Sequence, residues 1–394
     1  MRCLKIMDFS KYCDWSLEQL FKKYIDLQPD SEEEYYPDFF LKDIHTEYLK
    51  NEKVRLPHPL YATWDIIKEC NLNCVFCSAA APKIKNDYIE NGNVNIVVDK
   101  LMSSGIKYIS IRGGEPTLYR DITKVIEKLI HGGIFVEIVT NGCHVNAEFV
   151  DTIATLPKSM YRIKISIDSY RESVNDNQRG RGSFDIATNA MELCHENGIE
   201  YRNQMVITTN NYQDIKNTYE LCASLGAVSF GCMLLLPIGR GKNSKLRISL
   251  NKEILLQLIS IIENPKDTKV EKIGLGVDAI KLYTPYLNDE SITSQESVNI
   301  GHIKCNGAKT RIYINSNGDI YPCDLLQYDE FLLGNIMNND DFWYSQNARR
   351  FCNINRLNTE ICKDCQVKGC NMGCLAISIE NSRKSNRKIP NCEV

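Results

Sequence analysis

Residues 70–77 read Cys-Asn-Leu-Asn-Cys-Val-Phe-Cys and follow an apolar run over residues 60–67. One loop could therefore wrap a single metal centre with the thiols of Cys70, Cys74 and Cys77. Soft thiolates favour iron–sulfur clusters, zinc or cuprous ions. Three ligands suit a 4Fe-4S cube whose fourth iron takes an outside ligand, whereas zinc needs a fourth protein ligand nearby. The next cysteine, Cys143, is far along the chain. Three unrelated buried cysteines are the remaining alternative.

The Cys-x3-Cys-x2-Cys spacing, with Phe76 before the third cysteine, resembles the cluster loop of the radical S-adenosylmethionine (SAM) enzymes. The resemblance implies that SAM chelates the fourth iron through its amino and carboxylate groups. It also implies that one electron from the cluster splits SAM into methionine and a 5'-deoxyadenosyl radical. That radical would then take a hydrogen atom from the substrate.

Length and charge limit the possible classes of protein. The chain has 394 residues, which suggests two or three folding units. Its net charge of -3 gives no indication of a nucleic-acid or membrane partner. The first residues lack the apolar core of a signal peptide, and no apolar run approaches the length of a membrane span. We expect a soluble, cytoplasmic protein.

The cysteine content requires an explanation. The chain has 17 cysteines, and disulfides are rare where cytosolic thiols are held reduced. Apart from the opening loop, the cysteines concentrate near the carboxyl end, at Cys305, Cys323, Cys352, Cys362, Cys365, Cys370, Cys374 and Cys392. Metal or cluster ligation explains this distribution better than a disulfide framework does.

Strand-like and helix-like patterns alternate between about residues 59 and 236. Strands are expected at 60–67, 106–112, 134–140, 162–168, 200–208 and 228–236. Helices are expected at 94–105, 120–132, 146–156, 184–198 and 211–225. Alternating βα units imply a parallel sheet with right-handed crossovers. Six units match the partial (β/α)6 TIM barrel of the radical SAM family, an α/β fold whose site lies at the carboxyl ends of the strands.

The second expected strand ends in Arg112-Gly-Gly-Glu-Pro116. Glycines let backbone approach a ligand closely, and a carboxylate there could accept a hydrogen bond from a bound ammonium. The string is similar to the family's GGEP motif, whose backbone meets the SAM amino group. The resemblance implies cofactor contacts from Gly113, Gly114, Glu115 and Pro116. The alternative is an ordinary strand-to-helix turn, with proline starting the helix.

Polar residues also follow the third and fourth expected strands. By resemblance, Asn141, Ser166 and Asp168 contact the ribose or methionine part of SAM; each could instead be a turn or capping residue. Arg179 lies in a segment similar to one in the peptide-modifying branch of the family. Its guanidinium could bind a carboxylate or lie on a solvated loop. The string 237–241 (Pro-Ile-Gly-Arg-Gly) is similar to one before the C-terminal extension in that branch, or is a flexible connector.

The cysteine-rich end resembles the SPASM extension of radical SAM enzymes, which holds two auxiliary 4Fe-4S clusters. Two short antiparallel strands are expected around the turn at Gly318. By position, the outer cluster would be held by Cys362, Cys365, Cys370 and Cys392. The inner cluster would be held by Cys305, Cys323 and Cys374.

Two features of this array depart from a complete match. The family usually has five residues where this chain has four, between Cys365 and Cys370. The inner cluster is also one protein ligand short. Either Cys352 supplies that ligand or it is a buried bystander, in which case a substrate group could bind the open position. A pair of zinc sites is the alternative for the whole array.

Four regions are therefore expected along the chain. They are a helical N-terminal segment (1–55), the radical SAM partial barrel (56–240), a barrel-completing and linker segment (241–300) and the SPASM domain (301–394). The N-terminal segment is either an amphipathic cap on the main domain or an element that recognises a leader peptide.

The function implied by the resemblance is a radical SAM oxidoreductase with three 4Fe-4S clusters. It would crosslink or oxidise a ribosomally made peptide or protein, with auxiliary clusters as electron acceptors and a flavodoxin or ferredoxin as electron donor. The rivals are a small-molecule dehydrogenase or epimerase in sugar or aminocyclitol biosynthesis, and sulfatase-type formylglycine maturation. A non-catalytic zinc or electron-transfer module belongs to another class. No catalytic acid or base is identifiable from the sequence.

Overall fold

The computed structural model describes residues 56–82, 91–263, 272–275, 307–338 and 341–354, with residues 15, 16, 19, 20, 23, 305 and 376. Structural statements below concern these residues. Most of the expected N-terminal segment and of the linker lies outside them. So do five of the expected auxiliary ligands, Cys362, Cys365, Cys370, Cys374 and Cys392.

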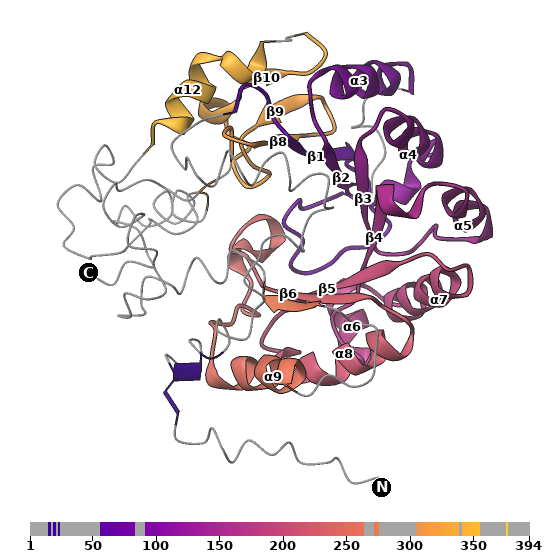
Figure 1. Cartoon of the computed structure of the whole chain (residues 1–394). Coiled ribbons are helices and arrows are strands. Elements are labelled where there is room, and N and C mark those ends of the chain that lie inside the picture. Colours follow the sequence, from indigo (N-terminus) through magenta and orange to yellow (C-terminus); the bar gives the residue numbers. More distant parts are fainter. Residues whose placement is uncertain are drawn as a thin grey trace, which may run out of the picture.

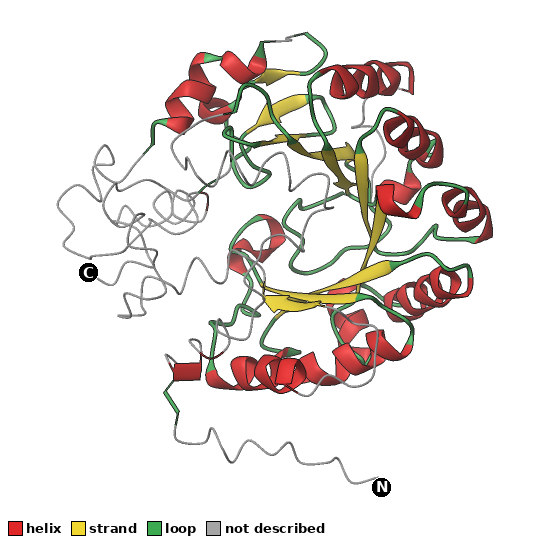
Figure 2. Ribbon diagram, in the orientation of Figure 1, coloured by secondary structure: helices red, strands yellow, loops and turns green. Residues whose placement is uncertain are grey.

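Six parallel strands pair in chain order and form a curved inner wall (Figure 1). They are β1 (Tyr61–Ile67), β2 (Tyr108–Gly113), β3 (Phe135–Thr140), β4 (Tyr161–Ser166), β5 (Tyr201–Ile207) and β6 (Ser229–Leu234). Figure 2 shows the helices on the outside of this wall. The architecture is the predicted partial (β/α)6 barrel.

The helices are α3 (Asn91–Ser103), α4 (Ile122–His131), α5 (Ala147–Ala154), α6 (Glu172–Arg179), α7 (Ser183–Glu196), α8 (Ile215–Ser224), α9 (Lys252–Glu263) and α12 (Gln346–Cys352). Short 3-10 turns are η4 (Pro116–Leu118), η5 (Lys158–Met160), η6 (Tyr212–Asp214), η7 (Gly239–Asn243), η9 (Asp329–Phe331) and η10 (Phe342–Tyr344). The five helices predicted in the barrel are confirmed within a few residues at each end.

Helix α6 is not predicted by the pattern of apolar residues. Its buried side chains are Asn175, Gln178 and Arg179. They recur at the spacing of one helix face, but all three are polar, so the face gives no hydrophobic period. In α4, by contrast, the buried positions are apolar, and the helix is read correctly.

The predicted carboxyl-terminal hairpin is confirmed, and it extends the barrel sheet. β8 (Arg311–Ile314) pairs in parallel with β1, and β9 (Asp319–Tyr321) pairs with β8 antiparallel. β10 (Gly334–Asn335) follows β9, and β7 (Lys272–Leu275) lies at the other edge beside β6. Figure 1 shows the orange hairpin next to the indigo first strand. The C-terminal region therefore begins as part of the same ten-stranded sheet.

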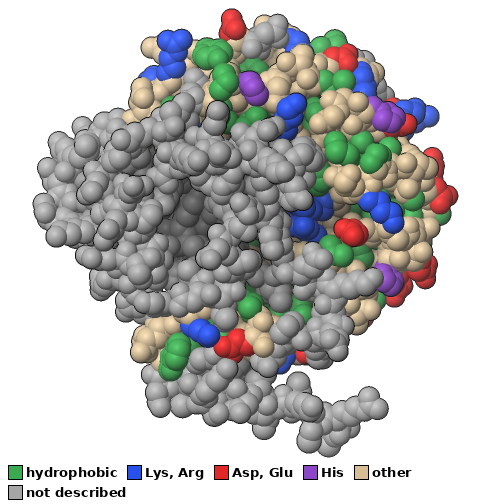
Figure 3. Space-filling view, viewed as in Figure 1, with side chains coloured by type: hydrophobic (Ala, Val, Ile, Leu, Met, Phe, Trp, Pro, Cys, Tyr) green, Lys and Arg blue, Asp and Glu red, His purple; other side chains and the backbone are tan. Residues whose placement is uncertain are grey.

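One hydrophobic cluster runs through the barrel and into the hairpin region. It includes Trp64 and Ile111 of the barrel, Ile312 and Ile314 of β8, and Phe351 of α12. Because helices and hairpin cover it, β1 is buried along nearly its whole length, as is typical of parallel sheets. Acidic and basic side chains are interspersed on the helical face in Figure 3, in agreement with the small net charge. Within the described ranges, no helix is long and apolar enough to span a bilayer.

Candidate functional site

The three cysteines of the opening stretch lie in a loop at the carboxyl end of β1. Cys70, Cys74 and Cys77 pack together with Leu72 and Ala81. The Leu72 amide donates a hydrogen bond to Cys70 Sγ at 3.4 Å. Burial raises the pKa of the Cys70 thiol to about 12 and also raises that of Cys74. Metal ligation requires thiolates, so a metal centre held by these cysteines would have to stabilise their deprotonated form.

The donor set fits a cluster better than a single ion. Across the described part of the chain, no three His, Cys, Asp or Glu side chains converge closely enough to hold one metal ion. A zinc ion binds all its thiolates at about 2.3 Å. An iron–sulfur cube binds each cysteine through a different iron, so its thiolates stand farther apart. The loop offers three thiols in one packed group, which leaves one iron of such a cube for an outside ligand.

The Gly113–Gly114 pair lies against the backbone that leads into the cysteine loop. Gly114 N donates to the Ile67 carbonyl at 2.7 Å, and Glu115 N donates to the Glu69 carbonyl at 2.8 Å. A Cβ at Gly114 would collide with the Glu69 carbonyl oxygen, and Gly113 has φ +144°. The glycines therefore allow close contact with the backbone of Ile67 and Glu69 rather than, in the first place, with a ligand.

The Glu115 carboxylate is 1% exposed and is engaged inside the protein. Its Oε1 accepts from Thr117 Oγ1 at 2.7 Å and from Thr140 Oγ1 at 2.6 Å, and its Oε2 accepts from Asn141 N at 2.7 Å. Burial raises the pKa of Glu115, while these hydrogen bonds oppose that change. Glu115 ties the ends of β2 and β3 together, and its contact with SAM stays a prediction.

Asn141 connects the end of β3 to the cysteine loop. Its Nδ2 donates to Asn71 Oδ1 at 2.8 Å, and its Oδ1 accepts from Cys143 N at 2.9 Å. Cys143 Sγ lies 3.6 Å from Thr117 Oγ1. The structure therefore brings Cys143 to the same end of the barrel, although the chain separates it widely from the loop.

Asp168 and Arg179 form a buried ion pair, with Arg179 Nε 2.6 Å from Asp168 Oδ2. Asp168 also accepts from Val206 N at 2.8 Å. The Arg179 guanidinium stacks over the Phe76 ring at 5.4 Å, and α6 thereby contacts the cysteine loop. The two predicted cofactor contacts are each other's partners here, and a contact of either with SAM stays a prediction.

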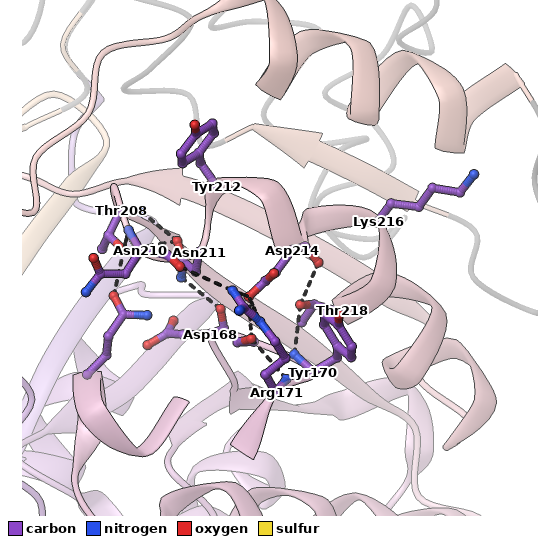
Figure 4. Close-up of polar contacts among 12 residues, drawn as sticks. Asp168, Tyr170, Arg171, Thr208, Asn210, Asn211, Tyr212, Asp214, Lys216 and Thr218 are labelled. Carbon is purple, nitrogen blue, oxygen red and sulfur yellow. Dashed lines mark hydrogen bonds and ion pairs between the residues drawn. The ribbon is translucent and has the colours of Figure 1, made fainter. Parts of the chain in front are cut away.

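A polar network extends from Asp168 across the ends of β4 and β5 (Figure 4). Asn211 Nδ2 donates to the Asp168 carbonyl at 2.8 Å. Arg171 pairs with Asp214 at 2.9 Å, and Ser169 Oγ donates to Asp214 at 2.6 Å. Asp168 is thus fixed on its backbone as well as on its side chain.

The remaining predicted residues lie at the same end of the barrel. Ser166 is half-buried as the last residue of β4. Pro116 starts η4, as the alternative strand-to-helix reading expected, with Glu115 as its N-cap. Whether either contacts a cofactor stays a prediction.

Arg240 is a site residue that the sequence did not predict. Its Nε donates to the Cys74 carbonyl at 2.7 Å and an Nη donates to the Ala81 carbonyl at 2.9 Å. Its backbone N donates to the Cys77 carbonyl at 2.9 Å. Gly239, at φ +53°, allows this approach. Residues 237–241 therefore hold the cysteine loop in place through hydrogen bonds. The only sign of this role in the sequence was an arginine between two glycines.

A second charged network links the barrel to the hairpin. Arg112 lies 3.2 Å from Asp65 and 2.6 Å from Asp324. The Tyr313 hydroxyl donates to Asp65 at 2.6 Å, and Arg311 lies 3.6 Å from Asp324. Burial raises the pKa of Asp324, but the two arginines outweigh it and hold that pKa well below its ordinary value. Asp324 directly follows Cys323, so these charges fix a predicted cluster ligand to the barrel.

Two family models match the chain. The radical SAM superfamily model matches residues 64–222, which include the cysteine loop and the GGEP string. A model described as an iron-sulfur cluster-binding domain, SPASM, matches residues 305–366. The chain carries a radical SAM domain followed by a SPASM domain. SAM and iron–sulfur clusters are accordingly its expected cofactors.

Curated relatives of this radical SAM protein share about a quarter of its residues. The mycofactocin maturase MftC of Mycolicibacterium smegmatis is 25% identical over 343 residues, covering 86% of this chain and 83% of MftC. An AdoMet-dependent heme synthase of Methanosarcina barkeri is 25% identical over 287 residues, covering 71% of this chain and 79% of that protein.

Among solved structures, Streptococcus suis SuiB bound to the precursor peptide SuiA has the same fold as this radical SAM protein. Its TM-score is 0.71 at 21% identity, covering 90% of this chain and 80% of SuiB. The fold assignment from the βα pattern is thereby confirmed.

Proposed function

We propose that this radical SAM protein modifies a ribosomally made peptide, by a crosslink or an oxidation that begins with hydrogen abstraction. The observation that carries the proposal is the cysteine loop. It is fastened at the barrel end by Gly113–Gly114, Asn141, α6 and Arg240, and the sheet continues into a second iron–sulfur domain.

The peptide substrate is supported by the relatives. SuiB has been crystallised with a precursor peptide, and MftC is named a maturase. The heme synthase relative favours a second candidate, oxidation of a small molecule on the same barrel. Both candidates use the same first step and differ in what occupies the barrel.

The residues would divide the work as follows. Cys70, Cys74 and Cys77 would hold one 4Fe-4S cluster, which with SAM supplies a 5'-deoxyadenosyl radical when bound. Gly113 and Gly114 shape the wall beside it. Predicted cofactor contacts are Gly113, Gly114, Glu115, Pro116, Asn141, Ser166, Asp168 and Arg179.

Two auxiliary clusters would complete a set of three. The outer one would take Cys362, Cys365, Cys370 and Cys392, and the inner one Cys305, Cys323 and Cys374. They would accept electrons from the substrate. A flavodoxin or ferredoxin would donate electrons to the first cluster.

The proposal is tested with anaerobically reconstituted protein, SAM and dithionite. We expect about twelve irons per chain and formation of 5'-deoxyadenosine. Cys74→Ala should abolish that product, whereas Cys194→Ala, a buried barrel cysteine away from the loop, should not. Zinc without acid-labile sulfide in the wild-type protein would overturn the proposal.

The substrate class is tested separately with candidate peptides labelled with deuterium. Transfer of deuterium into 5'-deoxyadenosine, with a loss of hydrogen from the peptide mass, supports a peptide substrate. Labelled porphyrins and sugars are tested in parallel. Deuterium transfer from one of these alone would favour the small-molecule candidate.

A further inference from the structure

Three segments that carry cysteines lie together beside the hairpin, with Cys305, Cys323 and Cys352 on them. Their meeting point is Gly307, two residues after the first of them. A Cβ added to Gly307 would lie 2.9 Å from the Pro322 carbonyl oxygen and 3.1 Å from Phe351 Cε1. Pro322 directly precedes the second cysteine, and Phe351 directly precedes the third. The fold therefore brings together three cysteine-bearing segments that are far apart along the chain.

The Cys352 thiol is fastened to this meeting point. It ends helix α12, and its Sγ donates a hydrogen bond to the Ala308 carbonyl at 3.1 Å. Ala308 has φ +52°, a conformation that residues with a Cβ rarely adopt. Its amide donates to the Arg311 carbonyl at 2.9 Å, so the turn is attached to β8. Such backbone conformations concentrate at functional sites.

A positive charge lies next to the same thiols. The register that pairs Tyr313 with Tyr321 places Arg311 across from Cys323. Arg311 Nε is buried and has no hydrogen-bond partner among the described residues. A buried donor beside cysteine sulfurs suits an iron–sulfur cluster, whose potential depends on net charge and on hydrogen bonds to sulfur.

We propose that Cys352 is a protein ligand of the inner auxiliary cluster, in addition to the ligands that the proposed function assigns to it. The proposal rests on the proposed function, which supplies that cluster. It makes the inner cluster fully ligated by protein, with no iron open to substrate. The inner cluster then serves electron transfer, and the substrate binds elsewhere in the barrel.

The first test compares metal content in Cys352→Ala, Cys352→Ser and the control Cys194→Ala, all reconstituted anaerobically. We expect Cys352→Ala to lose between one and about four irons per chain and to change the electron paramagnetic resonance (EPR) spectrum. Cys352→Ser should retain iron through its oxygen but show a shifted spectrum. Circular dichroism matching the wild type in the serine variant establishes folding. Iron, sulfide and EPR spectra equal to wild type in both variants would overturn the proposal.

The second test asks whether an iron is open, with 2-mercaptoethanol as the probe. The added thiol should perturb the auxiliary-cluster EPR signal of Cys352→Ala and leave the wild-type signal unchanged. A perturbed wild-type signal would overturn the proposal. A wild-type protein without labile sulfide would instead refute the proposed function, so the two failures are distinguishable.

Discussion

The loop around Cys70 and the segment around Cys323 are held in place by different forces. Backbone carbonyls in the loop and just before it accept hydrogen bonds from Gly114, Glu115 and Arg240. Gly114 lies too close to the Glu69 carbonyl for any side chain to fit. Cys323 is instead held by a β-hairpin and by ion pairs of Asp324 with Arg112 and Arg311. The first arrangement depends on shape and the second on charge. Substitutions that add volume should therefore affect the loop around Cys70, and substitutions that remove charge should affect the segment around Cys323.

The largest effect is expected from Gly114→Ala. The added methyl group would collide with the Glu69 carbonyl and displace the residues that lead into Cys70. We expect loss of the first cluster, about four irons per chain, with the auxiliary cluster signals retained. Iron analysis and EPR measure this.

The control for that substitution is Gly133→Ala. Gly133 has φ +78° but open space around its Cβ position, so it tests conformational strain alone, about 1 to 2 kcal/mol. Retention of all clusters in both variants would refute the shape argument.

Arg240→Lys is expected to weaken the same cysteine loop without a steric collision. A lysine ammonium lacks the planar fork that reaches the Cys74 and Ala81 carbonyls together. We expect the first cluster to be lost about tenfold faster under air, equivalent to about 1.4 kcal/mol, as followed by visible absorbance. Arg247→Lys, at an exposed position, is the matched control. Equal rates for both variants would show that Arg240 does not hold the loop.

Charge removal at the hairpin is tested by Asp324→Asn and Arg112→Gln, singly and together. Each single change removes one of the two partners of a mostly buried charge, since Arg112 keeps Asp65 and Asp324 keeps Arg311. We expect a cost of up to about 3 kcal/mol, and the double variant should recover part of it. Hydrogen exchange of β8 amides, compared with those of β4, measures this. The exposed pair Asp121–Lys124 is the control, because surface pairs contribute little. Additive effects in the double variant would contradict the charge argument.

The smallest effect is expected from Tyr313→Phe. It removes the hydroxyl that donates to Asp65 at 2.6 Å, while Asp65 keeps Arg112 as a partner. We expect a loss of about 1 kcal/mol in β8 protection and no change in the first cluster. A change in cluster content here would mean that the two regions are not independent.

The sequence was sufficient for the barrel because its strands and most of its helices carry an apolar period. It failed at α6, where Asn175, Gln178 and Arg179 form the buried face. It also failed at Arg240, because hydrogen bonds to distant carbonyls leave no local pattern. The internal partners of Glu115 and Asp168 could not be read either, since Thr140 comes from β3 and Arg179 from a helix without an apolar period.

The pairing of β8 with β1 has a consequence for the order in which the molecule is made. Tyr61 pairs with Arg311, so at about 5 to 20 residues per second the ribosome needs roughly 10 to 50 seconds between the two. Throughout that interval the open edge of β1 presents unpaired backbone groups to any other strand. We expect nascent chains truncated before β8 to aggregate, and chaperones to engage the first strand until its last-made neighbour arrives.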